Sequence, residues 1–442
     1  MAEALSSLPE NPANVPSASN EFHAPQLLKM TSVRWRICAL LFFANTINYT
    51  DRQVLGVLAP LLQTKIGWTE TQYGYIVVAF QLAYAIGLLF AGGIMDAIGV
   101  RLGYVLSIGL WSLAAISHAF VRTPLTFGIS RFFLGLGESG NFPAAIKTVS
   151  EWFPKKERAL ATGFFNCGTN FGATIAPAVV PWIAVTIGWQ WAFLFTGFFS
   201  FLWVVLWWTT YKSPEANSKV NAAELAHIRS DPPESAYSFP WARLLVHRQS
   251  WALLIGKFLT DPVWWFLLFW GPKYFASTFG VKLTGLALPL IIIYNVAAVG
   301  SIVGGWLPAQ LIKRGWSVRT ARRVSMLICA LAVTPLTMVG NIHTMGLAIA
   351  ILSLAAAAHQ GWSANIFTLA SDVFPRYAVG SVTGFAGFGG AAGGIVSAML
   401  IGPLLDKYHN YFWPFLVAGT LYLIALLIIR ILIPKADPIT QV

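Results

Sequence analysis

Long apolar stretches recur along almost the whole chain, and they limit the possible folds more than any other feature. A helix needs about 20 consecutive, mostly apolar residues to cross the hydrocarbon core of a bilayer. Windows of that kind lie at residues 36–62, 72–95, 102–121, 125–149, 159–187, 190–211, 251–278, 284–312, 321–340, 343–371, 378–404 and 411–433. We therefore expect an all-α membrane protein with twelve transmembrane helices.

Composition argues against the usual alternative, a soluble protein of two or three domains. Charged residues make up 10% of the 442 residues, against roughly 25% in ordinary soluble domains. Apolar residues reach 56%, and the mean hydropathy is +0.64. Twelve spans need roughly 240 apolar positions. This is close to the apolar share of the chain, so a helical bundle accounts for nearly all of it.

The basic residues indicate how the chain is oriented in the membrane. The formal net charge is +12. The densest basic cluster, from Arg314 to Arg323, lies between apolar windows and has no nucleic-acid-binding motif, so we expect no nucleic-acid partner. On alternate loops most lysines and arginines fall on one side, while the other side holds Lys65, Arg122, Lys273, Lys282 and Lys407. The positive-inside rule then predicts cytoplasmic termini and a cytoplasmic segment 212–248, in the inner (plasma) membrane of the cell.

The ends of the chain and the cysteines add little chemistry. Residues 1–32 are rich in Pro, Ser, Asn and Ala and lack a signal-peptide pattern. This composition predicts a disordered cytoplasmic tail. We expect residues 434–442 to form a second, short cytoplasmic tail. Cys38, Cys167 and Cys329 lie in separate apolar windows, which favours neither a disulfide framework nor a zinc site. We expect no metal and no cofactor.

A repeat within the chain predicts its division into two halves. Ser150-Glu151-Trp152-Phe153-Pro154 returns as Ser371-Asp372-Val373-Phe374-Pro375, and Ala161-Thr162-Gly163-Phe164 returns as Val382-Thr383-Gly384-Phe385. Both pairs are 221 residues apart, and the same offset places Gly168 on Gly389 and Gly172 on Gly393. We therefore expect six-helix halves at 33–211 and 249–433, joined by a linker at 212–248. Parallel repeats of this kind are typical of secondary transporters.

Four charged residues lie deep inside predicted spans of the first half: Asp51, Arg52, Arg131 and Glu138. A charge at the centre of a membrane helix costs at least about 2.5–3.5 kcal/mol, so such residues are candidates for function. Asp51 and Arg52 lie about 22–24 Å from the start of the first span, past the midplane. Arg131, in a span that runs the opposite way, is roughly 10 Å below the outer surface, at the level of Arg52. Glu138 follows two helical turns later and points toward the same interior.

These charges allow two interpretations. In the first, they form a structural ion-pair network, Asp51 with an arginine and Glu138 with Arg131. In the second, Arg52 or Arg131 binds a substrate carboxylate through its planar guanidinium, while Asp51 or Glu138 carries a proton. The two interpretations are compatible if they apply to different conformations.

Polar and aromatic residues near the charges suit a sugar-like ligand. Asn48, Tyr49 and Tyr84 offer amide and phenol groups for hydroxyls, and flat faces for a ring come from Trp264, Trp265, Trp270 and Trp362. In the tenth span a polar strip, which favours a cavity lining, consists of His359, Gln360, Ser363 and Asn365. Lys257 and Asp261, near the start of the seventh span, have the spacing of a mutual salt bridge, and their role stays open. The glycines of 163–172 and 384–394 predict close helix packing rather than ligand contact.

The chain resembles the major facilitator superfamily, and within it the anion:cation symporter branch. The loop Gly92-Gly93-Ile94-Met95-Asp96-Ala97-Ile98-Gly99-Val100-Arg101 resembles the superfamily loop G-x-x-x-D-R-x-G-R-R and departs from it at Ala97 and Val100. The resemblance implies that Asp96 and Arg101 gate the cytoplasmic side. The runs Asn48-Tyr49-Thr50-Asp51-Arg52 and Arg131-Phe132-Phe133-Leu134-Gly135-Leu136-Gly137-Glu138 resemble the first and fourth helices of the branch. There, the acidic residues carry protons and the arginines handle the organic anion.

Two further runs narrow the resemblance. The segments 257–266 and 359–365 resemble those of hexuronate (glucuronate and galacturonate) transporters, and the similarity as a whole spans residues 33–433. It implies a small organic anion and protons as ligands. We expect a monomer in the lipid bilayer.

Three hypotheses for the function of the chain remain. The first is proton-coupled symport of a sugar-acid anion, such as glucuronate or galacturonate, into the cell by alternating access. The second is uptake, exchange or export of another organic anion, such as galactonate, glucarate or tartrate. The third is a membrane-embedded enzyme, which would gather His, Asp or metal ligands at one membrane interface. The sequence contains no such cluster.

Overall fold

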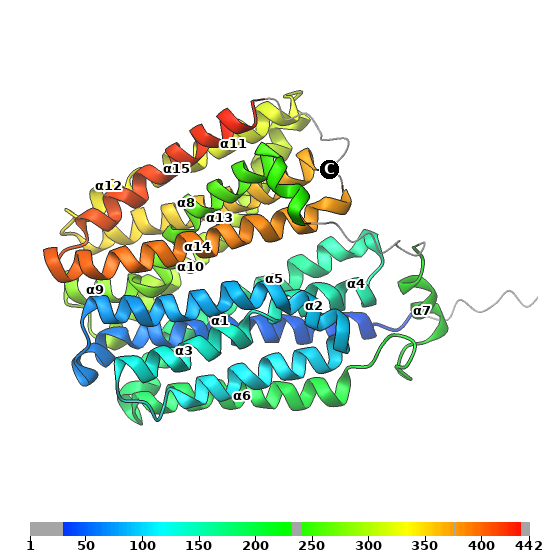
Figure 1. Ribbon diagram of the computed structural model, residues 1–442, viewed down its shortest axis with the longest axis horizontal. Helices are drawn as coiled ribbons and strands as arrows, with labels where there is room; N and C mark the ends of the chain where they lie inside the picture. Colours follow the sequence, from blue (N-terminus) through cyan, green and yellow to red (C-terminus); the bar gives the residue numbers. More distant parts are fainter. Residues whose placement is uncertain (1–29, 232–240, 375, 435–442) are drawn as a thin grey trace, which may run out of the picture.

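The protein is a bundle of helices that run along one common axis (Figure 1). The computed structural model describes residues 30–231, 241–374 and 376–434, and within these ranges it contains no β-strand. The elements are α1 (Val33–Ile66), α2 (Glu70–Ser117), α3 (Pro124–Glu138), α4 (Asn141–Trp152), α5 (Lys155–Thr186), α6 (Trp189–Thr210), α7 (Ala222–Ile228), η1 (Trp241–Val246), α8 (Arg248–Phe269), α9 (Gly271–Phe279), η2 (Leu283–Leu286), α10 (Ala287–Lys313), α11 (Val318–Val333), α12 (Leu336–Val339), α13 (Met345–Val373), α14 (Arg376–Tyr408) and α15 (Phe412–Leu432). The predicted tails lie outside the described residues, apart from 30–32 and 434.

The helices provide the twelve predicted crossings. Within the described ranges, nine helices are long and apolar enough to cross a membrane. One of them, α2, has 48 residues, or about 72 Å of helix. Gly99 interrupts it with φ 77° and ψ 156°, so α2 crosses twice. The other two crossings are α1 and the pair α3–α4, which is interrupted at Ser139 and Gly140. The prediction of a twelve-helix membrane fold is confirmed.

The crossings form two bundles of six. In Figure 1, α1 to α6 make up the lower bundle and α8 to α15 the upper one. Three sets of contacts join the two bundles: α2 packs against α14, α5 packs against α10, and α1 packs against α8 and α9. Below, the end of the molecule that carries α7 is called the α7 end, and the opposite end is called the far end.

The repeated glycines lie at equivalent helix contacts in the two halves. An added Cβ would come within 2.0–2.6 Å of a backbone carbonyl oxygen at Gly168, Gly172, Gly389 and Gly393. In the first half these oxygens belong to α1, which packs on α5; in the second half they belong to α8, which packs on α14. Glycine lets the backbones approach this closely because it has no side chain. The prediction that these glycines serve helix packing is confirmed.

Replacing Gly172 by alanine should therefore lower the stability of the protein. Overpacking of this kind typically costs about 1–3 kcal/mol, and the neighbouring atom is backbone, which cannot turn aside. The melting temperature of the detergent-purified variant measures the effect. Gly163→Ala is the control, because it lies on the same helix and its added Cβ would meet nothing within 4 Å. Equal melting temperatures for the two variants would contradict this account of the repeat.

The segment between the halves is held to the first half through α7. Glu224, which is fully buried, accepts hydrogen bonds from the backbone N–H groups of Val33 and Arg34, both at 3.1 Å, and from Arg34 Nη1 at 3.0 Å. It thereby caps the start of α1. Glu157 accepts from Arg34 Nε at 3.0 Å and lies 2.8 Å from His227 Nε2. Burial alone would raise the pKa of Glu157, but the hydrogen bonds from His227 and Arg34 outweigh it and hold that pKa below its usual value.

Candidate functional site

A buried ion pair links α1 to the end of α3. Arg52 donates to Glu138 Oε2 from Nη2 at 2.8 Å and from Nε at 3.0 Å. Both side chains are almost completely buried. Glu138 is the last residue of α3, directly before the interruption of the fourth span. Within the part of the chain that the structure describes, its second oxygen, Oε1, has no hydrogen-bond partner, so the carboxylate keeps an unused acceptor.

Arg131 lies at the same depth but is not the partner of Glu138. Its Nη2 donates to the backbone oxygen of Arg52 at 3.2 Å, which confirms the predicted shared level of the two arginines. Its Nε and Nη1 have no hydrogen-bond partner among the described residues, although the side chain is fully buried. Buried polar groups rarely stay unpaired in proteins. The free donors of Arg131 therefore mark a position where an anion would be stabilised.

Aromatic rings surround the guanidinium of Arg52. Its Cζ atom lies 4.7 Å from the ring centroid of Tyr49, 4.9 Å from Tyr84, 5.2 Å from Phe80 and 5.5 Å from Trp265. Ring faces attract a cation and leave its N–H groups free to bind in the guanidinium plane. Because Trp265 belongs to α8, both halves of the protein contribute rings to this group.

Asp51 points away from this group. Its Oδ2 accepts from Ser200 Oγ on α6 at 3.0 Å, and its Oδ1 has no hydrogen-bond partner in the ranges that the structure describes. Neighbouring positions on a helix differ by about 100° in direction, which separates Asp51 from Arg52. The structure therefore brings together Arg52, Arg131 and Glu138, and leaves Asp51 on the α6 side of α1.

Two amide side chains complete the polar surroundings. Asn48 Oδ1 accepts from Arg52 Nη2 at 3.4 Å, while its Nδ2 is unpaired. Gln81 is buried on α2, and neither its Nε2 nor its Oε1 has a hydrogen-bond partner among the residues that the structure describes. A Cβ on Gly394 of α14 would lie 2.9 Å from Gln81 Nε2 and 3.1 Å from Trp265 Nε1, so Gln81 reaches the contact between the halves. Gln81 was not among the residues predicted from the sequence. Its polarity within the window 72–95 was the available signal.

The second half adds a cluster around His359. Its Nδ1 lies 2.5 Å from Tyr422 Oη, and its ring stacks on Trp264 at a centroid distance of 5.5 Å. Trp362 is fully buried and packs edge-on against Tyr422, with centroids 5.3 Å apart. His359 and Trp362 thus pack α13 against α8 and α15.

The other residues of the predicted polar strip divide into two kinds. Asn365 donates to the backbone oxygens of Gly304 at 2.9 Å and Gly361 at 2.8 Å, which fastens α13 to α10. Gln360 and Ser363 are half-buried, and their side chains make no hydrogen bond within the described part of the chain. These two side chains remain available to a ligand.

Lys257 and Asp261 form the salt bridge that their spacing predicts. Lys257 Nζ lies 2.9 Å from Asp261 Oδ2 across one turn of α8. Asp261 packs against α14, where an added Cβ on Gly390 would lie 2.0 Å from its Oδ2. Lys257 Nζ also lies 4.7 Å from the ring centroid of Phe367 on α13. The pair is therefore held among three helices of the second half.

The predicted gating residues are bound within the first half. The Asp96 side chain is 75% exposed, and it accepts from Lys147 Nζ at 2.6 Å. Arg101 Nη2 donates to the backbone oxygen of Trp208 at 2.7 Å, and its Cζ lies 4.4 Å from the ring centroid of the same residue. In this conformation the partners of both side chains belong to the first half.

At the far end, polar contacts join the two halves. Asp406, near the end of α14, accepts hydrogen bonds from the backbone N–H groups of Glu70 at 2.9 Å and Thr71 at 2.8 Å, and from Thr71 Oγ1. Glu70 in turn accepts from Lys273 Nζ of α9 at 2.5 Å. Asp406 therefore caps α2 from the other half, where the helix dipole favours a negative charge. These contacts close the far end.

Asp406→Asn should weaken this closure. Losing one charge-assisted set of hydrogen bonds costs about 1.5–3 kcal/mol, so the population open at the far end should rise at least about 10-fold. Distances between spin labels at Lys65 and Lys282, in a background without native cysteines, report that population. Lys407→Gln is the control, because it removes an adjacent exposed charge that lies 5.1 Å from the ring centroid of Tyr408. An unchanged distance distribution for Asp406→Asn would show that Asp406 does not hold the halves together.

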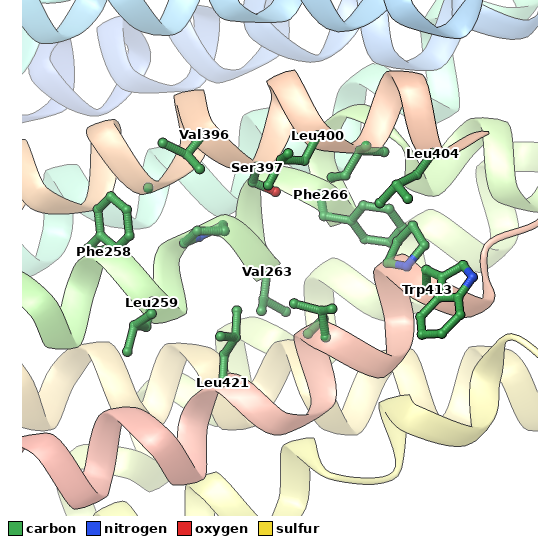
Figure 2. A pocket seen from close by; sticks show the side chains of 16 residues that line it. Phe258, Leu259, Val263, Phe266, Val396, Ser397, Leu400, Leu404, Trp413 and Leu421 are labelled. Atoms are coloured by element: carbon green, nitrogen blue, oxygen red, sulfur yellow. The ribbon is translucent and has the colours of Figure 1, made fainter. Parts of the chain in front are cut away.

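A separate cavity of about 240 Å³ lies among α8, α14 and α15. In Figure 2 its labelled side chains are aliphatic or aromatic, apart from the hydroxyl of Ser397 and the indole nitrogen of Trp413. No charged residue lines it. Since an unpaired anion is costly to bury, we place the candidate site at Arg52, Arg131 and Glu138 instead.

Known proteins resemble the chain along most of its length. Residues 41–398 match the sequence pattern of the Major Facilitator Superfamily. The hexuronate transporter of Escherichia coli (strain K12) is 31% identical over 389 residues, which cover 86% of this chain and 89% of that protein. The D-galactonate transporter of Escherichia coli O6:H1 is 28% identical over 388 residues, which cover 85% and 90%. The probable galactarate/D-glucarate transporter of Bacillus subtilis (strain 168) is 29% identical over 402 residues, covering 87% and 88%.

Solved structures share the arrangement of helices. A bacterial homolog of the human lysosomal transporter Spinster, in an inward-facing and unoccupied conformation, superimposes with a TM-score of 0.74 at 17% identity and covers 93% of this chain and all of its own. A D-xylose–proton symporter gives a TM-score of 0.72 at 16% identity, with 92% and 100% coverage. At these identities the similarity concerns the fold alone.

Proposed function

Because the chain belongs to the Major Facilitator Superfamily, and so is a transporter and not an enzyme, we propose that it imports a sugar-acid anion together with protons. The proposed substrate class is the hexuronates, such as glucuronate and galacturonate. Relatives named as transporters of hexuronate, galactonate, and galactarate or glucarate support a sugar acid as the substrate.

The buried group of Arg52, Arg131 and Glu138 carries the proposal. Two cations lie beside one carboxylate, so the group carries a net positive charge, which would attract an anion. Arg131 has free donors for a carboxylate, and guanidinium groups bind carboxylates more specifically than ammonium groups do. The rings of Tyr49 and Tyr84 pack on Arg52, and their hydroxyls would suit the hydroxyls of a sugar. The substrate would thus be held by its charge on the first half.

The second half would form the opposite wall of the site. Trp265 already reaches Arg52, and its flat face suits a sugar ring. Gln360 and Ser363 have free polar groups for further hydroxyls. We propose a supporting role behind this wall for Trp264, His359, Trp362 and Asn365. A substrate that touches both halves is what rocking of one half against the other requires.

Glu138 is the proposed proton carrier. In the empty site Arg52 neutralises it. An arriving carboxylate competes for the same guanidinium, and Glu138 then loses its partner. A buried carboxylate without a cation is stable only when protonated, since the charged form is poorly solvated there. Anion binding would therefore bring a proton with it. Asp51, buried against α6, is the second proposed carrier.

We infer that the structure is open toward the cytoplasm. The far end is closed by Asp406 and Lys273, while Asp96 and Arg101 contact partners of their own half at the α7 end. The excess of basic residues on the loops at the α7 end supports a cytoplasmic position for that end, with the protein in the inner membrane of the cell. Closure of the α7 end would bring Asp96 and Arg101 toward the second half, where they would act as the gate.

Competition for uptake tests the substrate class. Proteoliposomes containing the protein would take up labelled glucuronate in the presence of galacturonate, galactonate, glucarate, tartrate or glucose. We expect the strongest competition from galacturonate and none from glucose, which lacks a carboxylate. If another acid competes more strongly than galacturonate, that acid and not a hexuronate is the preferred substrate. Equal inhibition by glucose would overturn the proposed carboxylate site.

A further inference from the structure

A groove with arginines along its rim lies on the second half at the α7 end, bordered by α11, α13 and α15. These three helices belong to the upper bundle of Figure 1. Its volume is about 580 Å³. Its charged lining consists of Arg319, Arg322, Arg323, Arg430 and Asp372. The groove is formed by helices of one half alone, so it is distinct from the site at Arg52 and Arg131.

The positive charge of the groove is only partly compensated. Arg322 Nε donates to Asp372 Oδ2 at 2.9 Å. Arg323 Nη2 donates to two backbone carbonyl oxygens just past α15, at 3.1 and 2.7 Å. Arg319 and Arg430 are exposed and make no hydrogen bond or ion pair within the described residues. Four cations against one carboxylate create a positive potential that attracts an anion.

Below the arginines, the walls of the groove are apolar. On α15, Leu427 and Leu423 lie three and seven residues before Arg430, on the same face of the helix. On α11, Leu327 lies two turns beyond Arg319, with Arg323 between them. The side chain of Leu427 is 58% exposed. The apolar part extends about 10 Å from the rim, so each wall is an arginine followed by an aliphatic surface.

We propose that this groove binds an anionic phospholipid, such as phosphatidylglycerol. The phosphate would lie between Arg319 and Arg430, and an acyl chain would lie along Leu423, Leu427 and Leu327. A soluble anion would use the arginines but leave the exposed leucines uncovered. A zwitterionic lipid would cover the leucines but add a cation beside the arginines. Basic pockets between membrane helices on the cytoplasmic side are known to bind anionic head groups, and the charge distribution predicts this side for the groove.

Native mass spectrometry of the delipidated, detergent-solubilised protein tests the proposal. The full chain would be titrated with phosphatidylglycerol and, separately, with phosphatidylcholine of the same acyl chains. Each arginine near a phosphate contributes about 1 kcal/mol. The double variant R319Q/R430Q should therefore bind phosphatidylglycerol about 20–30-fold more weakly than the parent. Its binding of phosphatidylcholine should not change.

A matched control distinguishes binding at this groove from general attraction of the lipid by positive charge. K313Q/R314Q removes two cations at the same end of the second half that do not line the groove, and we expect its affinity for phosphatidylglycerol to stay within about 2-fold of the parent. Equal losses in both double variants would overturn the proposal. So would equal affinities of the parent for the two lipids, or competition by inorganic phosphate at the same concentration as the lipid. Melting temperatures would confirm that the variants are folded, and R319K/R430K should retain most of the lipid affinity.

Discussion

Arg131→Ala is expected to lower sugar-acid uptake about 100-fold, while the protein still folds and inserts. Truncating one partner of a buried charge pair typically costs about 2–5 kcal/mol of binding. Folding should survive because, in the described ranges, Arg131 makes a single hydrogen bond, to the backbone of Arg52, and its other two nitrogens have no hydrogen-bond partner. Arg131→Lys keeps the charge but loses the planar donor group, so we expect it to recover little of the affinity. Initial uptake rates over a range of substrate concentrations measure the change.

Arg122→Gln is the control for this loss. It removes a cation of the same half that lies near the membrane surface over the ring of Trp189, 5.3 Å from its centroid. Uptake by this variant should stay near that of the parent. Arg52→Ala should be at least as damaging as Arg131→Ala, since it also leaves Glu138 without its cation. Near-normal uptake by both Arg131→Ala and Arg52→Ala would show that these arginines do not bind the substrate.

Glu138→Gln is expected to abolish accumulation driven by a pH gradient and to preserve exchange. Glutamine imitates the protonated acid permanently, so the site can still bind the anion and cross the membrane loaded. It has no proton to release, and a proton gradient therefore cannot drive net uptake. Counterflow of labelled against unlabelled sugar acid should remain within a few-fold of the parent. Loss of both activities, or retention of both, would count against Glu138 as the proton carrier.

Asp51→Asn distinguishes the two carboxylates. Asp51 contacts Ser200 and not Arg52, so the substitution should leave the arginine site in place. We expect the same uncoupling as for Glu138→Gln, with substrate binding preserved because Arg52 keeps its contacts with Glu138 and Asn48. Ser200→Ala is the matched variant, because it removes the hydrogen bond and keeps the acid. If Asp51→Asn and Glu138→Gln both accumulate substrate like the parent, these carboxylates are structural and the coupling scheme is wrong.

The overall architecture could be predicted from the sequence because it depends on composition and spacing. The apolar windows gave the twelve crossings, and the constant offset between repeats gave the equivalent contacts at Gly172 and Gly393. Depth in the membrane was also predictable, since each residue adds a fixed rise along a helix. This placed Arg52 and Arg131 at one level, as their 3.2 Å hydrogen bond shows.

The partners within the site could not be predicted in the same way. Depth does not give the direction in which a helix is rotated, and rotation decides that Glu138 meets Arg52 and not Arg131. It also turns Asp51 toward α6 and turns His359 and Trp362 toward Tyr422. Contacts between distant segments leave no local pattern either. The capping of α2 by Asp406 joins residues more than 300 positions apart, and Gln81 lies beside Gly394 of the other half, at a similar separation along the chain.

The measurement that tests the central claim most directly is proton movement caused by substrate. Lightly buffered proteoliposomes, with no gradient imposed, would receive glucuronate on the outside while the external pH is recorded. The account predicts that the medium becomes more alkaline as the sugar acid enters. It predicts no such change with Glu138→Gln under the same conditions. Entry of labelled glucuronate into parent proteoliposomes without any pH change would contradict proton coupling through the pair of Arg52 and Glu138.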